Sequence, residues 1–130
     1  MAHTKTNLKN DVDDIAPQFG LEGSIEARFG RTPLGCEKLG VTYMSFAPGF
    51  RPPFAHKHRE QEEVYVVVSG GGRAKVEDEI VDLEQWDALK VPGPAVRSFE
   101  AGPEGLEMII VGAPVFAESD GEMINDWWTD

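Results

Sequence analysis

The stretch of sequence that is most informative about the fold is residues 49–70, which read GFRPPFAHKHREQEEVYVVVSG. Two short runs within it, 54–58 and 63–68, lie on either side of a polar turn, and the second contains four valines and a tyrosine. Runs of β-branched and aromatic residues between Gly- and Pro-containing breaks are typical of β-strands, because such side chains fit a pleated surface. We therefore predict two consecutive strands in this stretch.

The rest of the chain follows the same pattern, because Gly and Pro interrupt it at short intervals and short apolar runs lie between them. Evenly spaced short strands with turn signals indicate a β-sandwich or barrel. The Gly-rich segment 69–72 is typical of a hairpin turn and is predicted to end the valine strand. The further strands that we expect are 24–29, 40–47, 73–77, 80–83, 88–91, 96–100 and 106–111. The predicted fold class is all-β.

The length of 130 residues fits one domain with parts at either end. We expect residues 1–22, which are polar, to form an N-terminal arm and residues 23–116 to form the barrel. Residues 117–130 are expected to be a C-terminal tail. Trp127 and Trp128 are unusual in a solvated acidic segment, so we expect this tail to pack on the barrel or on a dimer partner.

The charge of the chain argues against nucleic acid as a partner. The formal net charge is −11, with 23 acidic and 12 basic residues, and no Lys or Arg follows Arg97. Such a chain repels phosphate backbones. A short central group of basic residues could instead favour an anionic small molecule.

The composition also bears on the cellular compartment. No segment approaches the roughly 20 apolar residues of a membrane helix, and the N-terminus lacks the apolar run of a signal peptide. Cys36 is the only cysteine and cannot form an internal disulfide, which suits a reducing compartment. We expect a cytoplasmic protein with no membrane partner.

His56, His58 and Glu63 are the candidate metal ligands. Alternate residues of a strand share one face and lie about 6.5 to 7 Å apart, so both imidazoles point the same way. With a carboxylate from the next strand they make a 2-His-1-carboxylate face, whose nitrogen and oxygen donors suit Fe, Mn, Ni, Cu or Zn. The alternative is a pair of solvated histidines in a charged turn. Glu63 opens a valine strand, where an unpaired carboxylate would be costly, and a metal ion would satisfy it.

These residues resemble the first motif of the cupin family. That motif has a glycine, H-x-H, a glutamate and a second glycine, which match Gly49, His56, His58, Glu63 and Gly70. Residues 86–99 resemble the second cupin motif only in part. The resemblance implies a jelly-roll β-barrel of two antiparallel sheets, which is usually a homodimer.

Arg97 stands where the cupin family normally has its last metal-binding histidine. A guanidinium is not a metal ligand, because it has no acceptor atom. Two arrangements are open. In one, Arg97 turns outward or anchors an anionic substrate beside a three-ligand metal; in the other, Arg97 replaces the metal and pairs with Glu63 directly.

The resemblance leaves three hypotheses of function. The first is a metal-dependent enzyme, an oxygenase or isomerase, acting on a small and anionic molecule, with Arg97 as the substrate anchor. The second is a metal-free cupin that binds a small molecule or regulates without catalysis. The third is a protein that acts through its dimer surface. The candidate pocket walls are Tyr43, Phe54, Tyr65, Trp86, Phe99 and Met108.

Overall fold

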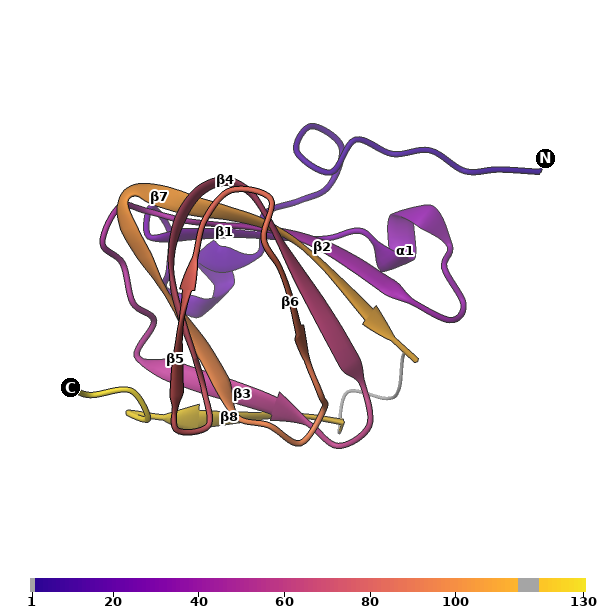
Figure 1. Cartoon of the computed structure of the whole chain (residues 1–130). Helices are drawn as coiled ribbons and strands as arrows, with labels where there is room; N and C mark the ends of the chain where they lie inside the picture. Colours follow the sequence, from indigo (N-terminus) through magenta and orange to yellow (C-terminus); the bar gives the residue numbers. More distant parts are fainter. Residues whose placement is uncertain (1, 115–119) are drawn as a thin grey trace.

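A single antiparallel sheet of eight strands curls on itself, so that two layers of strands face each other (Figure 1). The structure is a computed structural model, and it describes residues 2–114 and 120–130. The strands are β1 (Ile25–Phe29), β2 (Gly40–Phe46), β3 (Phe54–His58), β4 (Glu62–Val76), β5 (Glu79–Leu83), β6 (Ala88–Val91), β7 (Arg97–Ala113) and β8 (Gly121–Asn125). Two short helices, η1 (Ala16–Phe19) and α1 (Arg31–Leu34), lie on either side of β1 in the sequence.

The two long strands, β4 and β7, pass through both layers. Residues 62–70 of β4 pair with residues 106–113 of β7, in a layer that also contains β1, β2 and β6. Residues 72–76 of β4 pair with residues 97–101 of β7, in the layer of β3, β5 and β8. The all-β jelly-roll fold expected from the sequence is therefore confirmed.

The predicted hairpin turn at residues 69–72 is wrong, because β4 continues through the glycines and bends there. The pairing with β7 shifts register between Val67 and Ser69 and again between Gly70 and Gly72. A Cβ atom on Gly70 would collide with the carbonyl oxygen of Gly105, and Gly70 has a φ of 70°. The glycines thus let two backbones approach closely where both strands cross from one layer to the other.

A cluster of buried apolar side chains fills one part of the space between the layers. It includes Tyr65 and Val67 of β4 and Phe99 and Met108 of β7. The alternate residues of β4, Val64, Val66 and Val68, face outward and are half-buried. One face of the valine strand therefore supplies the core and the other remains partly accessible.

Parts of both terminal segments contact the barrel. Val12 and Ala16 of the predicted arm are buried, and Nζ of Lys9 lies 5.2 Å from the ring centroid of Tyr43. Residues 121–125, which belong to the predicted tail, form β8 and pair with β3 (Figure 1). The predicted boundary between barrel and tail at 116/117 lies outside the described residues.

Trp128 is the anchor of the last residues. Its ring is buried, and the guanidinium carbon of Arg51 lies 4.2 Å from the ring centroid. Arg73 approaches the same ring at 5.3 Å. Among the residues that the structure describes, no helix has the length and apolar character of a membrane span.

Candidate metal centre

His56, His58 and Glu63 meet between the two layers of the barrel. The two histidines are alternate residues of β3 and point inward, and Glu63 is the second residue of β4 in the opposite layer. Each offers one ligand atom, and these three atoms lie within 4.8 Å of one another. The spacing along the sequence therefore corresponds to a cluster in space.

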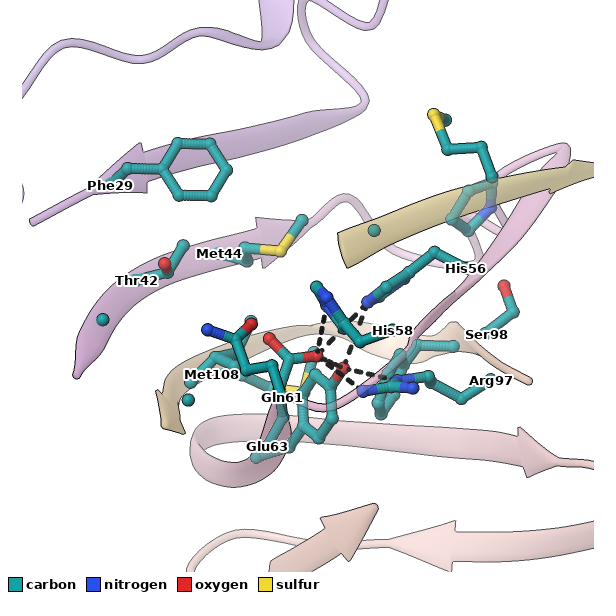
Figure 2. A pocket seen from close by; sticks show the side chains of 18 of the residues that line it. Phe29, Thr42, Met44, His56, His58, Gln61, Glu63, Arg97, Ser98 and Met108 are labelled. Atoms are coloured by element: carbon teal, nitrogen blue, oxygen red, sulfur yellow. Dashed lines mark hydrogen bonds and ion pairs between the residues drawn. The ribbon is translucent and has the colours of Figure 1, made fainter. Parts of the chain in front are cut away.

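One carboxylate oxygen, Oε1 of Glu63, is the centre of this cluster (Figure 2). The hydroxyl of Tyr65 donates to it at 2.6 Å, and Nη2 of Arg97 donates to it at 2.9 Å. Nε2 of His56 lies 3.3 Å away and Nε2 of His58 lies 3.5 Å away. Exposure increases from Arg97 at 0% through Glu63 at 13% and His58 at 17% to His56 at 35%, so Arg97 forms the floor and His56 faces the solvent.

The surroundings of Glu63 keep it ionised. Burial alone would raise the pKa of its carboxyl group, but the contacts with His56, His58 and Tyr65 hold that pKa well below its usual value. Burial and the negative charge of Glu63 raise the pKa of Tyr65, so its hydroxyl stays protonated and donates a hydrogen bond to the carboxylate. The cluster therefore has one fixed negative charge at its centre.

Arg97 points inward and makes the direct contact with Glu63 that the second of the two arrangements expects. Its Nε donates to the hydroxyl of Tyr65 at 3.1 Å. Its Nη1 donates to the backbone carbonyls of Gly93 at 3.0 Å and Ala95 at 2.8 Å. These bonds and the bond to Glu63 use four of the five N–H donors of the guanidinium, which leaves little of it for a substrate.

Asp120 orients His58 from behind. Its Oδ2 lies 3.1 Å from Nδ1 of His58, and its two carboxylate oxygens also accept bonds from the backbone N–H groups of Glu60 and Gln61. Burial would raise the pKa of Asp120, but these bonds hold it below its usual value. An ionised carboxylate can only accept, so the proton of the imidazole is on Nδ1 and the lone pair of neutral His58 is on Nε2.

These donors fit a divalent transition metal ion. In the tautomer that Asp120 favours, Nε2 of His58 and Oε1 of Glu63 are both acceptors and lie 3.5 Å apart, an arrangement that a cation between them would satisfy. Ligand atoms that bind one ion at about 2.0–2.2 Å lie about 3–3.5 Å apart. A carboxylate behind a ligating histidine is also the usual second partner in metal sites. Arg97 opposes the ion, because its positive charge is bound to the same carboxylate.

A cavity of about 420 Å³ opens beside the cluster. Met44 of β2, Phe54 of β3 and Ile110 of β7 are among its apolar walls. Phe29 and Met123 also line it while being 50% and 57% exposed, which places its mouth between β1 and β8. In Figure 2, Phe29 and Met44 lie across the cavity from the histidines.

The predicted pocket walls are only partly correct. Four of the six candidates line the cavity: Phe54, Tyr65, Phe99 and Met108. Tyr43 instead faces outward, where its hydroxyl donates to Glu107 beneath Lys9, and Trp86 is 71% exposed. Asp120 was missed, and so was the part that the Tyr65 hydroxyl plays between Glu63 and Arg97.

Comparison with known proteins agrees with this architecture. No family model matches the chain. It is 21% identical over 118 residues to the uncharacterised protein MJ1618 of Methanocaldococcus jannaschii, which covers 90% of this chain and 94% of that protein. The cupin protein BF4112 from Bacteroides fragilis superposes with a TM-score of 0.71 at 18% identity, over 90% of this chain and 88% of that one.

Two further similar solved structures are an enzyme and a complex with a small molecule. Oxalate decarboxylase from Bacillus subtilis has a TM-score of 0.77 at 23% identity; the match covers 94% of this chain but only 32% of the decarboxylase. A variant of Streptomyces PAC13 with uridine has a TM-score of 0.73 at 21% identity, over 97% of this chain and 93% of that one. At these identities the likeness defines the fold, and the chain has the cupin fold.

Proposed function

We propose that this protein is a cupin that binds one divalent transition metal ion through His56, His58 and Glu63 and uses it to act on a small molecule in the adjacent cavity. The observation that carries the proposal is the convergence of the three ligand atoms within 4.8 Å. The bond between Asp120 and Nδ1 of His58 supports it, because it presents the Nε2 lone pair to the cluster.

The residues of the chain have distinct parts in this proposal. His56, His58 and Glu63 would hold the ion, and Asp120 would hold the tautomer and orientation of His58. When bound, the ion would polarise a substrate oxygen or activate water or dioxygen. Oxygenase and isomerase chemistry are both compatible with such a face, which leaves coordination positions open.

The test is the metal content of the purified protein, followed by titration with Fe, Mn, Ni, Cu and Zn salts. The proposal expects close to one ion per chain and its loss in the double variant His56→Ala/His58→Ala. His3→Ala is the matched control, because His3 is the third histidine of the chain and lies exposed in the N-terminal arm. Protein that refuses every one of these metals would contradict the proposal.

A second candidate function is a metal-free barrel that binds a small molecule without catalysis. The observation that favours it is the distance of 2.9 Å between Arg97 and Glu63, because a guanidinium already balances the buried carboxylate. The two candidates differ in the metal titration. In the metal-free barrel, a ligand would bind equally well before and after treatment with a chelator.

We also infer that two copies of the chain associate through the outer face of β4 and β7. Val64 pairs with Val111 and Val66 pairs with Ile109 on this face. Val111 is 37% exposed and the other three are half-buried, so the face has a continuous apolar strip. Exposed apolar patches of this kind mark interaction surfaces.

A further inference from the structure

We propose that the ligand of the cavity is a small monocarboxylate with an apolar body, which places its carboxylate at the metal centre and its body among the Met and Phe side chains. This inference rests on the metal ion proposed above. It adds the chemical class of the ligand, which follows from how the walls and charges of the cavity are distributed.

The apolar side chains that line the cavity indicate an apolar body for the ligand. Phe29, Met44, Phe54, Met108, Ile110 and Met123 come from five different strands and line the cavity. A volume of about 420 Å³ is at the small end of ligand pockets, so the body is compact. The polar side chains of the lining outside the metal centre are Arg31, Thr42, Gln61, Ser98 and Glu122. The six apolar side chains offer no hydrogen bond to a polyhydroxylated body, so the part of the ligand that lies against them should be apolar.

The charges around the metal centre indicate that the polar end of the ligand, its head, is a carboxylate. Glu63 and Asp120 contribute two negative charges and Arg97 contributes one positive charge, and all three contact one another or His58. The other two charged residues of the cavity lining, Arg31 and Glu122, have opposite charges, so a divalent ion added to the whole set leaves one positive charge in excess. One carboxylate neutralises that excess, whereas a neutral ligand leaves a net charge beside an apolar cavity.

The position of the centre also favours a ligand with one polar end. His56 is the most exposed of the three ligands and is 35% accessible, and it lies on the cavity side of Arg97, which is fully buried. The polar groups thus lie together on one side of the cavity, where Met123 is the cross-strand neighbour of His56, and Phe29 lies across the cavity from them (Figure 2). A molecule that places its carboxylate beside His56 would leave its body against the apolar walls.

The test uses the full chain loaded with cobalt(II), whose visible absorption reports a change in its ligands. Acetate, hexanoate, hexanamide and gluconate are titrated by calorimetry and absorption, and the cobalt content of each sample is measured. We expect affinity to rise roughly fourfold for each added methylene, which is roughly 250-fold from acetate to hexanoate. Hexanamide and gluconate should bind at least tenfold more weakly than hexanoate.

A pair of variants separates the cavity from the metal. Met44→Gln puts a polar amide in the wall, so it should weaken hexanoate at least fivefold while acetate affinity and cobalt content stay the same. Ile80→Gln is the matched control, because Ile80 is 45% exposed on β5, away from the cavity, and should change neither.

Each outcome bears on a different part of the argument. Cobalt-loaded protein that binds hexanoate no tighter than acetate, or gluconate tighter than hexanoate, would overturn the apolar body and leave the metal centre intact. Equal affinity for hexanoate and hexanamide would overturn the carboxylate head. Samples that retain no cobalt would contradict the proposed function itself, and the inference with it.

Discussion

Arg97 and Glu63 join the two layers of the barrel through an ion pair of 2.9 Å, at the position where a cupin usually has its last metal-binding histidine. Arg97 is fully buried and Glu63 is 13% exposed. A pair at this depth is weakly screened, so the guanidinium both stabilises the ionised carboxylate and competes with an incoming cation.

Replacing Arg97 should therefore have opposite effects on the two forms of the protein. In metal-free protein, Arg97→Gln leaves Glu63 without its buried counter-charge and should lower the free energy of unfolding by about 3–5 kcal/mol. With metal present, the same variant should bind the ion more tightly, because a competing positive charge is gone. Denaturant unfolding and metal titration measure the two effects.

Arg59→Gln is the control for this pair of effects, because Arg59 is exposed beside β3. It should change neither quantity appreciably. Weaker metal binding by Arg97→Gln would show that Arg97 supports the ion and does not compete with it.

Asp120 is expected to set the metal affinity through His58. Asp120→Asn removes the obligate acceptor at Nδ1, so the other tautomer of His58 becomes accessible and Nε2 is less available to an ion. We expect metal affinity to fall roughly 10–100-fold. Asp126→Asn, an exposed change in the same segment, should leave the affinity unchanged. Metal titration monitored by calorimetry distinguishes the two variants.

The hydroxyl of Tyr65 should contribute measurably to stability. It donates to Glu63 and accepts from Arg97 in a buried position, so Tyr65→Phe leaves two charged groups short of a partner. We expect a loss of about 1–3 kcal/mol in the free energy of unfolding. Tyr43→Phe removes a hydroxyl that donates to Glu107, a carboxylate that also pairs with Lys9, and it should have a smaller effect in the same denaturant titration. Equal losses of stability in the two variants would contradict the stabilising part assigned to the Tyr65 hydroxyl.

Acid should release the C-terminal anchor before it unfolds the core. Glu100 bonds to Arg51 at 2.9 Å and to Arg73 at 2.7 Å, and these arginines hold the ring of Trp128. Burial would raise the pKa of Glu100, but the two arginines hold it below its ordinary value of 4.5. The stability that these bonds provide is thus complete above pH 4.5 and is lost as the pH falls through the lowered value.

Tryptophan fluorescence followed from neutral to acidic pH measures this release. Glu100→Gln should abolish the acid step, because the amide cannot ionise, and should loosen the anchor at neutral pH. Glu104→Gln, at an exposed position nearby, should retain the step. An unchanged step in Glu100→Gln would assign it to another carboxylate.

The apolar strip on β4 and β7 should control association. Val111→Glu places a charge in the strip and should convert a dimer to a monomer in light-scattering measurements. Ile80→Glu adds the same charge at an equally exposed apolar residue on β5 and should not. A wild-type protein that is monomeric at all concentrations would contradict the inferred dimer.

The sequence predicted those features that depend on neighbours along the chain. The strands 54–58 and 88–91 have the expected bounds, because turn residues flank them closely. His56 and His58 share a face because of strand periodicity alone. The residues of the candidate cluster could thus be chosen from local spacing together with the cupin resemblance.

Features that depend on contacts between distant segments could not be predicted in this way. Asp120 is one of eight acidic residues after Arg97, and nothing near it in sequence indicates that it would reach His58. The glycines at 70–72 have the composition of a turn, and only the close approach of β7 shows that they let a strand cross. Whether the Arg97 side chain points inward or outward could likewise not be predicted, because it depends on the hydrogen bonds to the carbonyls of Gly93 and Ala95.

The ion pair between the two layers has a consequence for how the protein matures in a cell. Glu63 is in one layer, and Arg97 pairs with it directly from the other, so the chain itself supplies a positive charge for the buried carboxylate. We therefore expect the newly made chain to mature in a medium depleted of trace elements and to accumulate to the same level there. Scarcity of the ion would then lower the fraction of folded chains that hold metal and leave the amount of folded protein unchanged. Metal binding would follow folding and would be reversible.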